Sequence, residues 1–275
     1  KTATELSVTS PDNHNTIELK TAPLRYAVLR DGRTLVAETP IALTVDGKDL
    51  GKAEAAFRTD GAQARSGTVA APVYKKDSVD LSRNEGLADF GDWGVRLVAR
   101  NDGVAYRFET RRSGEITVQG ERGGVTVPDA KARCWLNYGM WPGCEETVPV
   151  ALNAGDIKTD GSDKRGWAGN NLVYLPFGYT VGGKTVVVTE SDVHDYPIWD
   201  LKRGADGGAG VRLESTFHFH PKETVHTAGW GAKEDSKTGG RWVQIRSFEN
   251  YLTKTAGTRT FPWRTFILGD SPAAL

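Results

Sequence analysis

The sequence has no excess of charge of either sign. Its 35 lysines and arginines balance 35 aspartates and glutamates, which gives a formal net charge of zero. A protein that binds the phosphate backbone presents a basic face, and balanced charge gives no reason to expect one. We therefore expect no nucleic acid among the partners of this chain.

Long apolar runs are also missing. No run approaches the roughly 20 residues that a transmembrane helix needs, so we expect no membrane insertion. No signal peptide is visible in the sequence. Because the chain starts at Lys1 without a methionine, we expect it to be processed or taken from a longer sequence.

Cysteine is scarce, with only two residues among 275. Cys134 and Cys144 flank the loop-like stretch WLNYGMWPG. In an exported protein they could form a disulfide that stabilises the fold by about 2 to 3 kcal/mol. Two free buried thiols are the other interpretation, and two cysteines alone are too few for a zinc site.

Helical periodicity is nearly absent, and short β-type runs separated by turns take its place. Only Ser247–Thr253 carries a possible helical cap and turn, and it could equally be a strand. The strands predicted from β-branched and alternating residues are Glu5–Thr9, Thr16–Lys20, Leu24–Leu29, Ile41–Val45, Trp93–Arg100, Val104–Thr110, Glu115–Gln119, Gly124–Val127, Asn171–Thr180, Thr185–Val188, Val211–Phe219, Trp242–Arg246 and Trp263–Leu268.

Turn signals support this pattern. Asp31-Gly32, Asp46-Gly47 and Asn101-Asp102-Gly103 supply residues that tolerate the positive φ of tight hairpins. Many strands at roughly ten-residue spacing, without helices for crossovers, indicate antiparallel sheets packed face to face. We predict an all-β fold, a large two-sheet antiparallel β-sandwich that forms one domain over residues 1–275.

Aromatic residues are expected to fill the space between the two sheets. We assign them to the core and give them no ligand role; they are Trp135, Phe177, Phe217, Phe219, Phe266 and Phe108. Two loop-like stretches, Asn153–Asn171 and Lys222–Gly240, contain Trp167 and Trp230. A tryptophan in such a loop can stack on a sugar or cover the edge of a core.

Familiar catalytic motifs are missing. There is no GxSxG, no HExxH and no P-loop signature. Asp156, Asp160 and Asp163 do not follow the spacing of an EF-hand. Glu145 and Glu146 are adjacent and would face opposite sides of a strand, so they make a poor glycosidase pair.

Histidines offer a second kind of site. His218 and His220 alternate on a predicted strand, which would place both rings on one face and allow them to chelate a metal, with His226 or an acid as a third ligand. The alternating pattern is also typical of a half-buried strand. Both interpretations stay open at this point.

The most informative stretch is Lys184–Asp200, KTVVVTESDVHDYPIWD. Its β-branched run predicts a buried strand, and the polar residues Glu190, Asp192, His194 and Asp195 follow within a few positions. A buried strand that ends in carboxylates can hold a charge on a rigid support, although such residues also form ordinary solvated turns.

Four segments in order resemble the N-terminal β-sandwich domain of glycoside hydrolase family 97. They are Ser10–Asp12 (SPD), Arg100–Phe108 (RNDGVAYRF), Tyr174–Pro197 (YLPFGYTVGGKTVVVTESDVHDYP) and Thr253–Leu268 (TKTAGTRTFPWRTFIL). The resemblance implies a sandwich of the galactose-mutarotase type, followed in the family by a catalytic (β/α)8 barrel and a small β domain. Such proteins hydrolyse α-glucosides or α-galactosides and use calcium.

The resemblance also implies what this chain contributes. The catalytic carboxylates of the family lie on the barrel, so we expect no catalytic residue here and assign no substrate-binding residue. The glutamate of the strand-end TE motif, which reaches the calcium, corresponds to Glu190. The family often has a glycine where this chain has Ile198, which puts any role for Asp195 or Tyr196 in doubt.

We therefore expect a non-catalytic domain that supports the barrel, walls part of the active site and supplies a calcium ligand, with a carbohydrate substrate and a periplasmic or secreted location. Tyr196–Trp199 is the candidate for part of the contact with the barrel. One alternative is a stand-alone carbohydrate-binding module that uses Trp167 or Trp230. Another is a mutarotase-like epimerase that uses His218 or His220 with a carboxylate.

Overall fold

The computed structural model describes residues 1–52, 54–71, 73, 76–139, 148–162, 172–205, 210–227 and 242–274. Their regular structure is β-strand apart from two short 3-10 helices, η1 (Ala154–Asp156) and η2 (Pro272–Ala274). In this part of the chain no helix has the length and apolar character needed to cross a bilayer. The all-β prediction is confirmed, and Ser247–Thr253 contains the end of a strand and bends instead of a helical turn.

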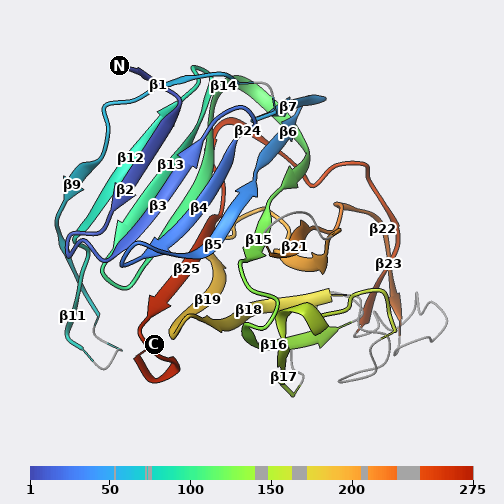
Figure 1. Cartoon of the computed structure of the whole chain (residues 1–275). Helices are drawn as coiled ribbons and strands as arrows, with labels where there is room; N and C mark the ends of the chain where they lie inside the picture. Colours follow the sequence, from blue (N-terminus) through green and yellow to red (C-terminus); the bar gives the residue numbers. More distant parts are fainter. Residues whose placement is uncertain are drawn as a thin grey trace.

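One large antiparallel sheet runs through the molecule (Figure 1). Its consecutive neighbours are β12 (Arg83–Asp89), β13 (Trp93–Arg100), β14 (Gly103–Arg122), β25 (Trp263–Gly269), β19 (Lys184–Ser191), β18 (Leu172–Val181) and β16 (Arg133–Gly139). A four-stranded sheet of β2 (Glu5–Thr9), β3 (Asn15–Lys20), β4 (Arg25–Arg30) and β5 (Arg33–Pro40) packs over β12 to β14. This is the predicted sandwich.

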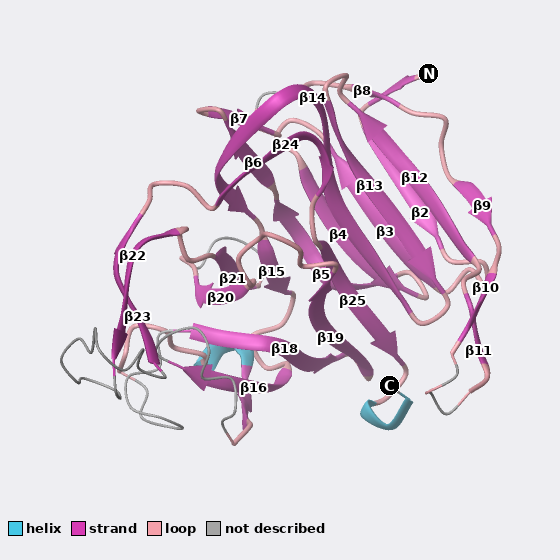
Figure 2. Ribbon diagram, turned by 180° about the vertical axis from the view of Figure 1, so that it is seen from behind, coloured by secondary structure: helices cyan, strands magenta, loops and turns pink. Residues whose placement is uncertain are grey.

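Most of the other strands extend the large sheet, and four of them form two separate two-stranded sheets (Figure 2). They are β1 (Thr2–Ala3), β6 (Ala42–Val45), β7 (Lys48–Leu50), β8 (Phe57–Arg58), β9 (Gln63–Arg65), β10 (Thr68–Ala70), β11 (Ser78–Asp80), β15 (Gly124–Val127), β17 (Val150–Asn153), β20 (Asp200–Arg203), β21 (Val211–Thr216), β22 (Pro221–Thr227), β23 (Trp242–Phe248) and β24 (Thr253–Thr260). β22 and β23 pair only with each other among the described residues, as a hairpin at one side of the molecule.

The core between the sheets is built by alternation. Ile17 and Val28 of the small sheet and Leu97 and Phe108 of the large sheet are buried, and side chains on the opposite faces, such as Glu18 and Arg96, are only partly buried. Side chains alternate between the two faces of a strand, so each strand offers every second residue to the core. Burial of this apolar surface provides the main stabilisation of the sandwich.

The prediction of core aromatics is partly correct. Phe108, Phe177 and Phe266 are buried, and Phe217 is partly buried against the core. Trp135 is 37% exposed because its side chain lies on the outward-facing side of β16. Phe219 is 44% exposed, and it lies beyond the end of β21 at Thr216. Those two assignments are wrong.

The hairpin predictions differ in detail. At Asp31-Gly32 both residues have positive φ, 51° and 73°, and Asp46-Gly47 behaves in the same way. The hairpin between β13 and β14 also forms, with Arg100 opposite Gly103, but none of Asn101, Asp102 and Gly103 has the expected positive φ. Asn101 instead contacts the loop between β2 and β3, where its side chain accepts the Asp12 N–H at 3.2 Å.

Candidate functional site

Glu190 lies at the end of β19, as predicted, but its side chain points into the domain. The neighbouring strand β25 places Arg264 directly opposite Glu190. Only 12% of the Glu190 side chain is exposed. Its Oε1 accepts the backbone N–H of Trp199 at 2.9 Å, and its Oε2 accepts Nη1 of Arg264 at 2.5 Å. The simple solvated turn is therefore not the environment of this carboxylate.

Arg264 is fully buried and is shared by two carboxylates. Glu121 on β14 accepts both Nε and Nη2 of Arg264 at 2.8 Å, whereas Glu190 accepts only Nη1. Tyr196 donates its hydroxyl to Oε2 of Glu121 at 2.9 Å. We call Arg264, Glu121 and Glu190 the Arg264 cluster. Two parallel hydrogen bonds make the pair with Glu121 the stronger one.

Aromatic rings enclose the guanidinium of Arg264. Its central carbon lies 5.0 Å from the ring centroid of Trp199, 5.1 Å from that of Phe217 and 5.9 Å from that of Tyr196. Arginine is suited to such a place because its planar cation is weakly hydrated and interacts favourably with aromatic faces. The rings also exclude water, which strengthens the ion pairs within the cluster.

The Arg264 cluster carries an unbalanced negative charge when ionised, because it contains two carboxylates and one guanidinium. Burial raises the pKa of Glu190 above its ordinary value, although Arg264 acts in the opposite direction. Burial also raises the pKa of Tyr196, and nearby Glu121 raises it further. An anionic group at the edge of a dry cluster is a place where a cation would be favoured.

The donor set can be tested against calcium. Each carboxylate oxygen can accept two hydrogen bonds or ligands, and each Glu190 oxygen has one hydrogen-bond partner in the structure. The hard oxygen and the net negative charge suit calcium, but six to eight ligands are needed. The described residues contain no group of three or more His, Cys, Asp or Glu side chains that could hold a metal. Glu190 thus fits as one ligand of a larger shell.

The polar residues after Glu190 remain at the surface. Asp192 is paired with Arg107 at 3.4 Å, and the carbonyl of His194 accepts Nη2 of Arg259 at 2.7 Å. Asp192 and Asp195 have positive φ, 62° and 49°, which turns the chain sharply after the strand. Asp192 and Asp195 are exposed, so of the three acids from Glu190 to Asp195 only Glu190 is brought into the domain.

The predicted histidine strand is not formed. β21 ends at Thr216, so His218 and His220 follow the strand instead of alternating along it. Nε2 of His218 is 3.9 Å from Oδ2 of buried Asp200, and burial lowers the pKa of His218. His220 stacks on Tyr251 with ring centroids 5.5 Å apart. The strand geometry that motivated the chelation hypothesis is therefore absent.

The expected contact region Tyr196–Trp199 needs correction. Trp199 is 1% exposed and Tyr196 is 8% exposed, so both are core residues and cannot form an open contact surface. Both rings belong to the core and lie beside the guanidinium of Arg264. Ile198, between them, remains 39% exposed.

An apolar groove lies next to this segment, between it and the β22–β23 hairpin. Its volume is about 1150 Å³. Five large apolar side chains in its wall are exposed: Ile198, Phe219, Val243, Ile245 and Phe248. We call this surface the hairpin groove. Contiguous exposed apolar side chains are typical of interaction surfaces and of ligand-binding grooves.

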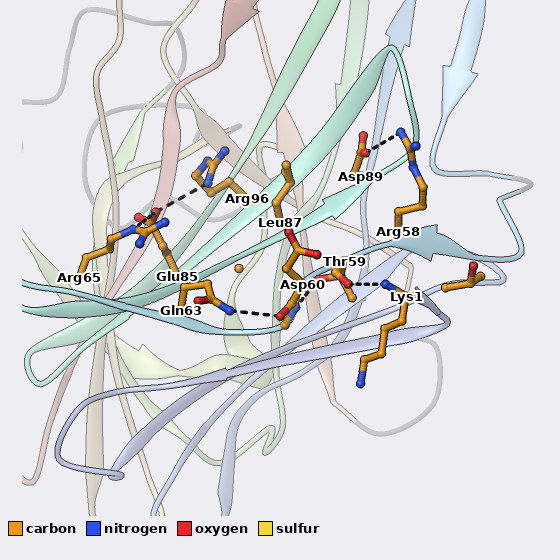
Figure 3. Close-up of a pocket in the computed structure, with 13 residues that line it drawn as sticks. Lys1, Arg58, Thr59, Asp60, Gln63, Arg65, Glu85, Leu87, Asp89 and Arg96 are labelled. Carbon is orange, nitrogen blue, oxygen red and sulfur yellow. Dashed lines mark hydrogen bonds and ion pairs between the residues drawn. The ribbon is translucent and has the colours of Figure 1, made fainter.

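A second pocket, of about 570 Å³, is polar (Figure 3). It lies at the edge of the large sheet, where β8 and β9 pair with β12, and several of its charges form ion pairs. Glu85 accepts Nε of Arg65 at 3.1 Å and Nε of Arg83 at 3.1 Å, and Arg96 lies 3.9 Å from it. We call these four residues the Glu85 cluster. Among the described residues that line this pocket, none has an aromatic side chain that could stack on a sugar.

Several expectations concern residues outside the described part of the chain. They involve Trp167, Trp230, Cys144 and the pair Glu145 and Glu146. Cys134 is described and buried, and burial raises the pKa of its thiol to about 12. The choice between a disulfide and two thiols therefore stays a prediction.

Sequence reasoning missed Arg264 and Glu121. Arg264, Phe266 and Leu268 are every second residue of β25, and their side chains lie on its buried face. A charged residue in line with two apolar ones could have been recognised from the sequence as a buried charge. Glu121 had no such signal, because a register irregularity between Val118 and Gly120 changes which residues of β14 face inward. Only the folded β14 places Glu121 beside Arg264.

Comparison with known families and proteins identifies the family of this chain. Residues 8–275 match the family described as Glycosyl-hydrolase 97 N-terminal. A retaining α-galactosidase of Bacteroides thetaiotaomicron is 26% identical over 285 residues, covering 96% of this chain. A probable retaining α-galactosidase of Streptomyces bingchenggensis is 33% identical over 127 residues, which is 44% of this chain and 19% of that protein. The chain spans 38% of the length of the Bacteroides protein.

Solved structures show the same fold. A glycoside hydrolase family 97 enzyme from Pseudoalteromonas sp. strain K8, in complex with acarbose, superimposes with a TM-score of 0.66 at 17% identity over 96% of this chain and 36% of that one. A β-arabinopyranosidase gives a TM-score of 0.64 at 18% identity over 97% of this chain and 40% of that one. At these identities the likeness establishes the fold alone.

Proposed function

The chain belongs to the Glycosyl-hydrolase 97 N-terminal family, and we propose from this that it is the non-catalytic sandwich domain of a calcium-dependent α-glycoside hydrolase. Residues 1–275 would form one domain of a longer protein whose catalytic residues lie on a (β/α)8 barrel. The observation that carries the proposal is a family match over residues 8–275 in a chain that spans 38% of a retaining α-galactosidase.

The role proposed for Glu190 is that of a calcium ligand supplied to the catalytic domain. Its carboxylate is held by the backbone of Trp199 and by Arg264, at the end of a strand that is paired on both sides. A rigid support of this kind orients a ligand before the metal arrives. When bound, calcium would contribute a fixed positive charge near the sugar. The other ligands would come from the barrel.

The role proposed for the hairpin groove is to pack against the rest of the polypeptide and so to support the barrel and wall part of its active site. The groove lies beside Ile198, a few residues after Glu190, so one docked domain could cover both. The occupant is assigned to the same polypeptide because the relatives extend far beyond the part that matches this chain.

The substrate proposed for the whole protein is a carbohydrate with a terminal α-glycoside. Both curated relatives carry α-galactosidase names, so α-galactosides are the first substrates to test and α-glucosides the second. We also propose a periplasmic or secreted location, as expected for glycan breakdown. Cell fractionation tests the location.

The central experiment is a calcium titration of the longer protein that contains this chain, comparing wild type with Glu190→Gln. The substitution keeps the shape of the side chain and removes its charge. We expect at least about tenfold weaker calcium binding together with lower α-galactosidase activity, because a carboxylate is a much better calcium ligand than an amide. Equal calcium affinity in the two proteins would contradict the proposal.

A second experiment tests where the catalytic groups lie. The 275-residue chain alone should hydrolyse neither nitrophenyl α-galactoside nor nitrophenyl α-glucoside and should bind calcium weakly, because one glutamate supplies only a small part of the shell. A preparation of the empty expression host is the control. Turnover clearly above that control would place the chemistry in this domain.

A further inference from the structure

The two carboxylates of the Arg264 cluster do not bind the arginine equally. Glu121 takes two of the guanidinium nitrogens, and Glu190 takes the third through one oxygen. The other oxygen of Glu190 is held by the Trp199 N–H, which is neutral. Glu190 is therefore held in place without being fully neutralised by the arginine.

This unequal sharing depends on Glu121. An arginine without Glu121 would have Glu190 as its nearest carboxylate, and the preferred arrangement of such a pair is two parallel hydrogen bonds. Forming it would turn the Glu190 carboxylate toward Arg264 and would use the lone pairs that a cation needs. Glu121 prevents this, because it already occupies Nε and Nη2.

The surroundings hold this arrangement in place. Tyr196 donates to the same Glu121 oxygen that accepts Nη2, which keeps Glu121 aligned with the guanidinium. Trp199 and Phe217 lie over the guanidinium and restrict its rotation. The two carboxylates therefore differ: Glu121 holds the arginine through two hydrogen bonds, and each oxygen of Glu190 has a single hydrogen-bond partner.

We infer that Glu121 is a positioning residue for Glu190: by holding Arg264 through two hydrogen bonds, it leaves the Glu190 carboxylate oriented and charged for a hard divalent cation that Glu121 itself does not touch. This inference rests on the proposed calcium role of Glu190. It assigns a second, buried glutamate to that function, on a strand distant in sequence from the TE motif.

The test uses the longer protein and calcium alone as the probe, with titration calorimetry as the readout. Glu121→Gln should weaken calcium binding about tenfold, although residue 121 is 2% exposed and remote from solvent. The control is Asp195→Asn, which removes one negative charge from the same strand end without contacting Arg264. Asparagine also tolerates the positive φ of 49° at that position. We expect less than a twofold change for the control.

A crystal structure of Glu121→Gln without calcium gives a readout that does not depend on the metal. We expect Arg264 and Glu190 to form a two-pronged ion pair. Glu121→Asp provides a second variant in case the glutamine variant folds poorly. It keeps the charge but is one methylene too short to hold both nitrogens, so calcium affinity should fall by an intermediate factor.

The outcomes separate the inference from the proposal on which it rests. If Glu190→Gln weakens calcium binding while Glu121→Gln and Glu121→Asp do not, Glu121 has only a structural role and the inference is overturned. An equal loss in Glu121→Gln and Asp195→Asn would also overturn it, since general charge would then explain the effect. If Glu190→Gln has no effect on calcium binding, the proposed function itself fails.

Discussion

The Arg264 cluster and the Glu85 cluster use the same residue types in opposite surroundings. Arg264 and Glu121 are 1% and 2% exposed, and their cluster has one more carboxylate than cations. In the Glu85 cluster one carboxylate meets several arginines, and Arg65 is 53% exposed. Water can replace an ion-pair partner in the exposed Glu85 cluster, but it cannot reach the buried Arg264 cluster. Burial and an excess of carboxylates over cations, more than the presence of ion pairs, therefore distinguish the candidate site from a surface network.

The largest effect should come from breaking the buried cluster. Arg264→Met removes the cation and leaves Glu121 and Glu190 buried without a counter-charge, so we expect a loss of about 3 to 5 kcal/mol in the free energy of unfolding. Urea denaturation measures it. Adding Glu121→Gln and Glu190→Gln to the same protein should recover part of the loss. A loss under about 1 kcal/mol for Arg264→Met would mean that water reaches the cluster.

The pH dependence of stability should sharpen the comparison, because the two glutamates shift in opposite directions. The pKa of Glu190 is raised above 4.5 by burial, so the folded state holds its proton more tightly and stability falls as pH rises above 4.5 through the folded pKa. Burial would also raise the pKa of Glu85, but hydrogen bonds from Arg65 and Arg83 lower it below 4.5. Its contribution is present above pH 4.5 and is lost as pH falls through the folded pKa.

Urea denaturation across this pH range, in the presence of a chelator, compares wild type with Glu190→Gln and Glu85→Gln. Glu190→Gln should remove the part of the wild-type stability that decreases as the pH rises. Glu85→Gln should remove the part that increases as the pH rises. The quantity to compare is the free energy of unfolding of wild type minus that of each variant, plotted against pH. If this difference changed in the same direction with pH for both variants, the electrostatic distinction between the clusters would be wrong.

The smallest effect should come from the exposed side of the Glu85 cluster. Arg65→Gln removes a partner that is more than half exposed, and we expect a loss of at most about 1 kcal/mol. High salt should reduce even this difference, because a surface ion pair is screened within a few ångströms at about 1 M ionic strength. A loss that is large and independent of salt would indicate that the pocket is closed to water.

Much of the sandwich could be predicted because its strands follow local rules. β2, β13 and β15 have the predicted bounds, and in the β-branched run of β19 Thr185, Val186 and Val188 are buried as expected, whereas Val187 is only partly buried. Strands without that pattern, such as β22 and β24, were missed because exposed polar residues dominate them. Their pairing partners hold them in the extended form.

The sequence by itself determined the all-β class, most strand positions, the family and the place of Glu190 at a strand end, because alternation, turn residues and motifs are local properties of the chain. Only the tertiary structure decided that Glu190 meets Arg264 and Glu121, that Trp199 is buried and that the hairpin groove is exposed. The physical reason is that these facts depend on strand pairing and on the register of β14. An irregularity of one residue there moves a side chain from one face of the sheet to the other.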